Sequence, residues 1–195
     1  MAKIIILNAP PGAGKDTIGK MISFYSPGEQ CRIISFKEPM FDIALAILGK
    51  ENYHRFMLAY DDREQKERPQ TFLIGMSPRE FMIWISEDVI KPKFGKDYFG
   101  VRFNQKVKEC DATVVCTDGG FPDEIISLIN AGNEVKLCRL HRDGFTFEGD
   151  SRNYIRINPY YQKNGYSEHD YLLSDGKPMI TVSEIIRDHL NSTNC

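Results

Sequence analysis

The chain has 195 residues, of which 42% are hydrophobic and 27% are charged, and its formal net charge at pH 7 is −2. This length and composition predict one globular domain with an ordinary hydrophobic core and exclude a chain that is disordered throughout. The slightly negative charge argues against a dedicated nucleic-acid binder, because affinity for a phosphate backbone needs a broad basic surface.

The first part of the sequence alternates short apolar runs with helical patterns. A short apolar run that ends at Pro or Gly is typical of a strand buried on both faces. The charged stretch 50–76 shows no regular period. The elements predicted here are, in chain order, a strand at Lys3–Leu7, a helix at Lys15–Phe24, a strand at Arg32–Phe36 and a helix at Pro39–Leu48 that Gly49 closes.

The clearest helix is expected at Ser77–Ile90. Its first residues, SPRE, predict a capping box with Ser77 as the N-cap, Pro78 at the first helical position and Glu80 reaching back. Apolar residues then recur on one face of this helix. We expect Pro92 to end it.

The last part of the sequence continues the alternation of strands and helices. Residues 142–170 interrupt it, because they are polar and aromatic without a sustained period. The elements predicted here are a strand at Ala112–Thr117, a helix at Asp123–Ala131 that Gly132 stops, a strand at Glu134–His141, a last strand at Tyr171–Ser174 and a helix at Thr181–Leu190 with TVSE as its capping box.

Strands that alternate with helices predict an α/β fold, with a parallel sheet covered on both faces by right-handed crossovers. In such a sheet, ligands bind at the carboxyl ends of the strands. Four polar or glycine-rich loops are expected at these ends, namely 8–17, 37–39, 117–121 and 142–152.

The stretch NAPPGAGKDT, residues 8–17, has the composition of a phosphate-binding loop. Gly12 and Gly14 allow the backbone to turn its amide hydrogens inward, that of Ala13 included, to bind the phosphates of ATP, and the following helix adds the positive end of its dipole. Lys15 supplies a point charge for the terminal phosphates of ATP. Thr17 supplies a hydroxyl ligand for Mg²⁺. The alternative is an ordinary turn with a surface lysine.

The loop departs from the general pattern G-x-x-x-x-G-K-[ST] at two positions, Ala9 and Asp16. The hydroxyl residue comes one place later, as in the GKGT and GKDT loops of nucleoside monophosphate kinases. We expect Asp16 to act through Mg²⁺ or its waters, or to orient a basic group near the acceptor. Alternatively, Asp16 is only an acid that suits the first turn of a helix.

Transfer of a phosphoryl group to a nucleotide needs a second anion site, because two charged phosphates must approach each other. Arg79 lies in the first turn of a predicted helix, where a cation is unfavourable unless an anion is near. Lys37 and Arg68 are further candidates to bind the acceptor. Asp118, at the end of a predicted strand, is expected to order Mg²⁺ or to contact a sugar or base. The alternatives are a solvated arginine for each of Arg79 and Arg68 and a turn-forming acid at Asp118.

Residues 142–170 are expected to form a lid-like segment over the triphosphate. Arg142 and Arg152 in this segment are candidates to stabilise the transferring phosphoryl group. The alternative is an ordinary exposed loop. Catalytic roles are thus expected for Lys15, Asp16, Arg79, Arg142 and Arg152.

The five cysteines are odd in number and include no CxxC pair, which disfavours a disulfide framework and a zinc site. They fit a reducing compartment best. The apolar run near the N-terminus is too short for a secretory signal or a membrane span. We therefore expect a cytoplasmic protein whose partners are small-molecule nucleotides, with neither nucleic acid nor membrane among them.

Several motifs together resemble the phage-type deoxynucleoside monophosphate kinases. They are GKDT at 14–17, SFKEPMFDIAL at 35–45, SPREFMIWISEDVIKPKFGKDYF at 77–99, TDGGFPDE at 117–124 and LLSDG at 172–176. The resemblance implies one phosphate-loop kinase domain over 1–195, with strand order 2-3-1-4-5 and an acceptor-binding helical region at about 37–104. It further implies ATP and Mg²⁺ as cosubstrates, a deoxynucleoside monophosphate as acceptor and, for a phage-encoded chain, the host cytoplasm.

The chain also departs from this family. Many relatives carry Arg where this chain has Gly120 and Lys where it has Phe41, and we expect Lys37 or an arginine of the lid-like segment to compensate. Two other functions stay open, namely another small-molecule kinase, such as one for a coenzyme precursor, and a nucleotide-binding regulator without an acceptor. A monomer and a homodimer are both compatible with the amphipathic helices.

Overall fold

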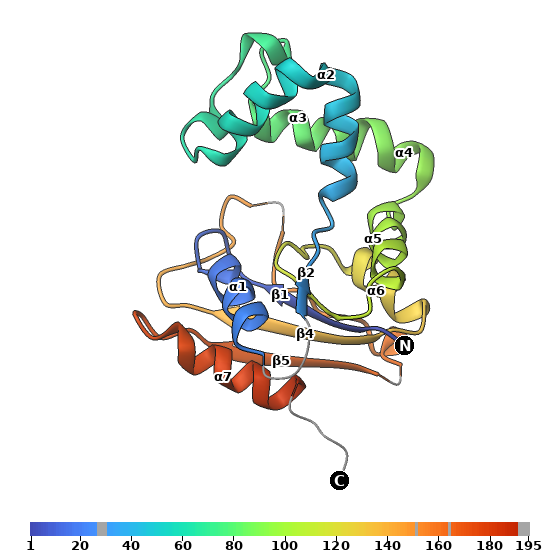
Figure 1. The fold of residues 1–195 in the computed structure, drawn as a ribbon, viewed down its shortest axis with the longest axis vertical. Coiled ribbons are helices and arrows are strands. Elements are labelled where there is room, and N and C mark those ends of the chain that lie inside the picture. Colours follow the sequence, from blue (N-terminus) through green and yellow to red (C-terminus); the bar gives the residue numbers. More distant parts are fainter. Residues whose placement is uncertain (27–30, 151, 164, 191–195) are drawn as a thin grey trace. The chain divides into compact units, whose positions relative to one another are not determined.

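The computed structural model describes residues 1–26, 31–150, 152–163 and 165–190. The chain forms two compact units, one made of Met1–Phe36 and Phe99–Cys195 and the other of Lys37–Tyr98 (Figure 1). The first unit contains the sheet, and the second is helical.

The first unit is built on a five-stranded parallel sheet in the order β2-β3-β1-β4-β5. This order and the helices around the sheet confirm the predicted α/β fold. The central strand β1 pairs with β3 on one side and β4 on the other, so that Ile5 lies opposite both Val115 and Lys136. The strands are β1 at Lys3–Asn8, β2 at Cys31–Ile33, β3 at Thr113–Cys116, β4 at Glu134–His141 and β5 at Tyr166–Leu172.

Two hydrophobic cores cover the two faces of the sheet, because successive residues of a strand point to opposite sides. Ile4 and Ile6 of β1 belong to one core, together with residues of α5 (Tyr98–Lys108) and α6 (Pro122–Asn130). Ile5 and Leu7 belong to the other, together with residues of α1 (Lys15–Tyr25) and α7 (Pro178–His189). Figure 1 shows α1 and α7 on one side of the strands and α5 and α6 on the other. Every β1 residue from Ile4 to Leu7 is fully buried, which explains its unbroken apolar run.

The two edge strands differ from the prediction. The strand expected at Arg32–Phe36 is shorter at its end, because Ser35 and Phe36 turn to bond Asp118 instead of continuing the ladder. The last strand starts at Tyr166 rather than at Tyr171. Its early residues are polar because Glu168 and Asp170 pair with the buried Arg139 of β4, so the usual apolar signal of a strand is absent.

The second unit begins with a long helix, α2, at Glu38–Asp61. Gly49 interrupts it with a non-helical backbone, as predicted, but the helix then resumes for another three turns. The prediction of an irregular segment from residue 50 is therefore wrong up to residue 61. Packing favours the helix here, since Phe56 is fully buried against the rings of Tyr53, Tyr60 and Phe81. Two short turns, η1 at Gln65–Glu67 and η2 at Thr71–Leu73, follow it.

The helix expected at Ser77–Ile90 begins as predicted and ends differently. Ser77 caps α3 (Pro78–Trp84) through both bonds of the capping box with Glu80. A wider π-helical turn, η3 at Ile85–Ile90, then leads into α4 at Lys91–Phe94. The prediction that Pro92 ends the helix is wrong. Pro92 lies in the first turn of α4, where its missing N–H costs little.

Two further helices, α5 and α7, differ from the prediction. The helix α5 follows directly after the FGKD turn and was not predicted. The prediction of a capping box at TVSE is wrong, because α7 starts at Pro178 and Thr181 therefore lies inside the helix. The Thr181 hydroxyl donates instead to the carbonyl of Leu172. Proline at the first position of α7 sets this earlier start.

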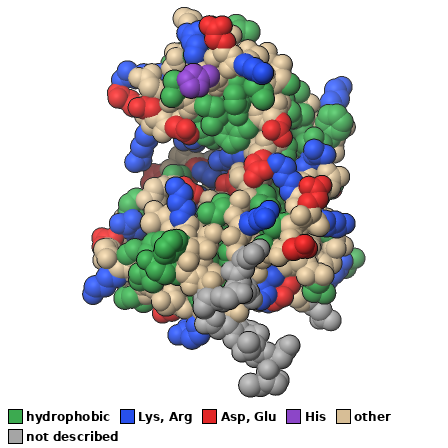
Figure 2. All heavy atoms as spheres, in the orientation of Figure 1, with side chains coloured by type: hydrophobic (Ala, Val, Ile, Leu, Met, Phe, Trp, Pro, Cys, Tyr) green, Lys and Arg blue, Asp and Glu red, His purple; other side chains and the backbone are tan. Residues whose placement is uncertain are grey.

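The surface of the second unit is partly apolar, and Figure 2 shows hydrophobic side chains among charged ones on the face in view. Its large exposed apolar side chains are Leu45, Ile47, Leu58, Ile74, Ile83 and Phe94. Within the described residues, none of the helices has the length and apolar character needed to cross a bilayer.

Candidate functional site

The loop between β1 and α1 lies at the carboxyl end of the central strand. Gly12 and Gly14 both have positive φ, at +77° and +104°, a conformation that glycine adopts at little cost. Gly14 is the N-cap of α1, and its carbonyl accepts the first helical bond from Ile18. Ala13 is buried, while Lys15, the first residue of the helix, is half-buried. The loop thus combines two left-handed turns with a helix N-terminus, as a phosphate cradle requires.

Arg142 follows β4 and contacts this loop directly. Its Nη1 donates to the carbonyl oxygen of Ala13 at 3.3 Å, and its guanidinium lies 4.7 Å from the centre of the Phe145 ring. Its other edge pairs with Asp175, in the turn after β5, with Nε to Oδ1 at 2.9 Å. A planar guanidinium with an aromatic ring on one face and a carboxylate on one edge has a defined orientation. Arg142 is therefore held beside the loop.

Asp118 lies after β3 and binds the chain after β2. Its Oδ2 accepts from the Ser35 hydroxyl at 2.6 Å and its Oδ1 from the Phe36 amide at 3.1 Å. These bonds join the ends of two neighbouring strands, which is a structural role for this carboxylate. Glu124 of α6 similarly accepts from the amides of Gly120 and Phe121, closing the turn that follows Asp118.

Asn8, the last residue of β1, connects the start of the loop after β1 to the segment after β4. Its side chain is buried; its amide donates to the carbonyls of Gly119 and Asn153, and its oxygen accepts from the amide of Ile155. Ile155 and Ile157 are themselves buried in the core beneath this edge. The chain from Asn153 to Ile157 is therefore fixed on the first unit.

Arg152 stands just before this fixed segment. Its Nε and Nη2 donate to the two carboxylate oxygens of Asp150 at 2.8 and 2.7 Å. Its aliphatic stem passes over Gly120, where a Cβ would lie 2.5 Å from the Cδ of Arg152. An arginine of the segment after β4 thus fills the space that a side chain at position 120 would need.

Arg139 of β4 explains how a charge is tolerated inside the sheet. It is 3% exposed and bonds Asp170, Glu168 and the carbonyl of Ile155. The hydrogen bonds from the Arg139 guanidinium hold the pKa of Asp170 well below its usual range. This network joins β4 and β5 to the segment that carries Arg152.

The predicted acceptor-binding residues Arg68 and Arg79 lie in the second unit. Nε of Arg79, in the first turn of α3, donates to both carboxylate oxygens of Glu67, at 2.7 and 2.9 Å. Arg68 pairs with Glu64 one turn before it. Both arginines are about half exposed, so their charged ends are accessible to an anion.

Lys37 and Phe41 belong to the start of α2. Lys37 is the N-cap residue, and its carbonyl accepts from the amides of Met40 and Phe41. The ring of Phe41 packs edge-on against Tyr60, at 5.2 Å between ring centres, and lies 6.4 Å from that of Phe56. Phe41 thus contributes to the aromatic core of the second unit.

The metal ligands expected at the start of α1 have suitable chemistry. Asp16 and Thr17 are both exposed in the first turn, and carboxylate and hydroxyl oxygens are donors that Mg²⁺ accepts. In the part of the chain that the structure describes, no cluster of three or more His, Cys, Asp or Glu side chains could hold a metal. Mg²⁺ does not need such a cluster, because it takes most of its oxygen ligands from water and substrate phosphates and only one or two from the protein.

Several residues that contact or support the candidate residues were not predicted from the sequence. Asn8 carries a usable signal, because a polar residue directly between a buried strand and the loop is unusual. Asp175 also has one, since it follows a strand in the same way as Asp118. The remaining missed residues are Glu67, Phe145 and Asp150, which bind arginines that only the fold brings close.

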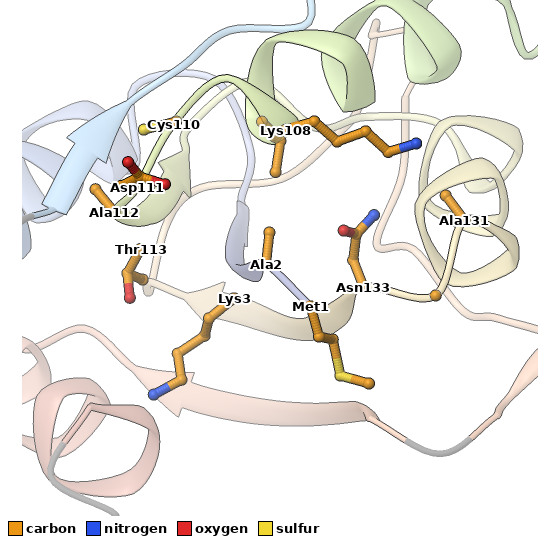
Figure 3. Close-up of a pocket in the computed structure, with 12 residues that line it drawn as sticks. Met1, Ala2, Lys3, Lys108, Cys110, Asp111, Ala112, Thr113, Ala131 and Asn133 are labelled. Atoms are coloured by element: carbon orange, nitrogen blue, oxygen red, sulfur yellow. The ribbon is translucent and has the colours of Figure 1, made fainter.

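A cavity of about 800 Å³ lies at the opposite edge of the sheet. Figure 3 shows its lining, which comes from the chain start through the first residue of β1, the end of α5, the loop before β3 and the loop before β4. Lys3, Lys108 and Asp111 are its charged residues. Because ligands of parallel sheets bind at the carboxyl ends of the strands, this cavity at the amino ends is not the candidate site.

No known protein-family model matches the chain, and no curated protein matches it significantly. The function is therefore inferred from the geometry of these residues.

Proposed function

We propose that the chain is an ATP- and Mg²⁺-dependent kinase that phosphorylates a deoxynucleoside monophosphate to the diphosphate, in the manner of the phage-type deoxynucleoside monophosphate kinases. The observation that carries the proposal is the contact of Arg142 with the loop that precedes Lys15. Two cations and a helix N-terminus meet at one loop on the carboxyl edge of a parallel sheet. Such an edge suits a triphosphate.

The proposed reaction asks little covalent chemistry of the protein. An oxygen of the acceptor phosphate attacks the γ-phosphorus of ATP, the bond from that phosphorus to the bridging oxygen breaks, and its electron pair leaves with ADP. The acceptor oxygen is already ionised, so a strong base is not needed. Positioning and charge neutralisation by the protein then account for catalysis.

Each proposed residue has a part in this neutralisation. Lys15 and the amides of 12–17 bind the phosphates of ATP, Arg142 neutralises charge beside the same loop, and Arg152 stabilises the transferring phosphoryl group. Bound Mg²⁺, held through Thr17 and through Asp16 or its waters, would supply further neutralisation of the phosphate oxygens. Arg79, with Lys37 and Arg68, is proposed to bind the acceptor phosphate, in keeping with the accessible guanidinium groups of Arg79 and Arg68.

The experiment that tests this proposal is a panel assay. The protein is incubated with ATP, Mg²⁺ and one of a set of nucleoside and deoxynucleoside monophosphates, and ADP formation is followed. We expect ADP formation that depends on at least one deoxynucleoside monophosphate. Its absence with every deoxynucleotide would overturn the proposal, and turnover with phosphorylated non-nucleotide acceptors alone would favour another small-molecule kinase. ATP binding without turnover on any acceptor would favour a regulator.

Lys15→Ala is the matched negative control for this assay. The side chain lies at the start of α1 and is only half-buried, so the fold should survive its removal. Circular dichroism checks the fold, and turnover should be lost. Turnover that persists in this variant would point to a contaminating kinase.

A further inference from the structure

We infer that Gly120 is a positioning residue for Arg152, and that together with Asp150 it sets this arginine in place on the sheet edge before any substrate binds. The inference rests on the proposed function for what Arg152 does. The site that holds this side chain, which we call the Arg152 seat, is formed by Gly120, Asp150 and Asn8 and lies within the first unit. The inference concerns the turn after β3 and the segment after β4, which are 32 residues apart in the chain.

The absence of a side chain at position 120 creates the space for Arg152. A Cβ there would lie 2.5 Å from Cδ, 3.0 Å from Cγ and 3.8 Å from Cβ of Arg152. The added carbon would therefore crowd the middle of the stem as well as its far end. Because a contact of 2.5 Å is well inside van der Waals distance, the arginine side chain from Cγ outward would have to move away.

Asp150 fixes the other end of the same side chain. It accepts from Nε and Nη2 of Arg152 and also from its backbone amide, at 2.8, 2.7 and 2.9 Å. The carboxylate side chain is only 7% exposed. A buried carboxylate with a two-point guanidinium partner is costly to separate from it, so the pair has one preferred geometry.

Asn8 completes the seat by fixing the backbone that follows Arg152. Its bonds to the carbonyl of Asn153 and the amide of Ile155 leave the chain little freedom at this point. An arginine with a fixed stem, a fixed head and a fixed following backbone is preorganised. A preorganised charge needs no rearrangement when the reaction occurs. An arginine placed in this way therefore stabilises the transition state of phosphoryl transfer more effectively than a mobile one.

The test compares Gly120→Ala, Asp150→Asn, Arg152→Ala and the double variant Gly120→Ala/Arg152→Ala. We expect Gly120→Ala to lower kcat at least tenfold with little change in the KM for ATP, and Asp150→Asn to act in the same direction. The double variant should be no slower than Arg152→Ala alone, because Gly120 acts only through that arginine. Additive losses in the double variant would overturn the inference.

Gly132→Ala is the control, because the φ of +81° at this position makes alanine strained there, while no atom lies within 4 Å of the added Cβ. It should reduce stability but leave kcat unchanged at a temperature where the variant is folded. A loss of kcat in this control equal to that of Gly120→Ala would show that destabilisation alone is responsible and would overturn the inference.

Hydrogen exchange of the unliganded protein separates the seat from the proposed reaction. Peptides that cover residues 142–153 should exchange faster in Gly120→Ala than in the original chain, whether or not any acceptor is phosphorylated. Unchanged exchange there would overturn the inference even for an active kinase. If the panel assay fails with all acceptors but exchange rises, the proposed function fails and the seat stands.

Discussion

Nε of Arg79 donates to both carboxylate oxygens of Glu67, so the carboxylate holds the guanidinium at Nε. Among the described residues, the terminal nitrogens Nη1 and Nη2 of Arg79 make no hydrogen bond. A guanidinium held at Nε leaves the edge formed by Nη1 and Nη2 exposed, and this edge can bind two phosphate oxygens at once. Glu67 therefore orients Arg79 instead of merely neutralising it.

The first prediction follows from this pair. If Arg79 binds the acceptor phosphate, Arg79→Ala should raise the KM for the acceptor by about 100-fold, since a two-point phosphate contact is lost. Glu67→Ala should raise the same KM by a smaller factor, because the arginine stays but loses its orientation. The KM for ATP should not change. Steady-state kinetics with varied acceptor measure both values.

Glu87→Ala is the control for this first prediction. Glu87 also holds a cation of the second unit, Lys91, at 2.6 Å, but neither residue is assigned to the acceptor. Its removal should leave the KM for the acceptor unchanged. Equal effects of Glu67→Ala and Glu87→Ala would contradict an orienting role for Glu67.

The second prediction concerns Asp16. This exposed acid in the first turn of α1 should act on phosphoryl transfer, so that Asp16→Ala lowers kcat by about 100-fold. ATP affinity, measured by calorimetry, should change by about threefold or less. Asp123→Ala is the control, since Asp123 is an exposed first-turn acid of α6. Losses of equal size in kcat and ATP affinity would support the alternative of a simple helix-dipole acid.

The central strands of the sheet are predictable from the sequence because both of their faces are buried, whereas the strand order was expected from the resemblance to the phage-type kinases. Strands buried on both faces are expected to be apolar throughout, and β1 from Ile4 to Leu7 and β3 from Val114 to Cys116 meet this condition, whereas half of the residues of β4 are polar. Loop residues with positive φ, such as Gly12 and Gly14, are likewise visible as glycines. These signals are local, so reading along the chain detects them.

The elements that escape prediction depend on contacts between distant residues. The polar start of β5 is a strand because Arg139 of β4 binds Glu168 and Asp170. The second half of α2 is a helix because Phe56 enters an aromatic core with Phe81. In the site, the same applies to Arg152, whose position depends on a glycine in another loop. Sequence reasoning finds the charged residues but not the partners that orient them.

The third prediction concerns backbone strain in the second unit. Ile74 has φ +56° and ψ +37°, which is the left-handed region, and its side chain is 92% exposed. A β-branched residue is strained there, and no burial offsets the strain. Ile74→Asn should therefore raise the free energy of unfolding of this unit by about 1 kcal/mol, because asparagine adopts this conformation more readily. Urea unfolding measures the change.

Ile83→Asn serves as the control for Ile74→Asn. Ile83 is 50% exposed in α3, where its backbone is helical. The same exchange there should give no gain in stability. A gain at Ile83 equal to that at Ile74 would mean that loss of exposed apolar surface, rather than release of strain, is the cause.

The fourth prediction is a dependence of stability on pH through His189 of α7. This side chain is 4% exposed, its Nε2 lies 2.9 Å from the hydroxyl of Tyr171, and its ring is 4.8 Å from that of His169. Burial lowers the pKa of His189 from 6.5 to about 4, and the nearby His169 and Lys136 act in the same direction. Asp188 and Glu134 oppose this shift without reversing it.

The sign follows from proton binding in the two states. Between pH 6.5 and about 4 the unfolded chain binds a proton at His189 and the folded chain does not, so the free energy of unfolding falls as the pH is lowered through this window. The loss should be on the order of 2 kcal/mol at pH 4.5. His189→Gln should remove this part of the pH dependence, whereas His54→Gln, at an exposed position of the second unit, should not. Urea unfolding of the three proteins from pH 7.5 to 4.5 measures the difference. Parallel curves for the original chain and His189→Gln would show that the pKa of His189 is the same in the folded and unfolded states and would contradict the prediction.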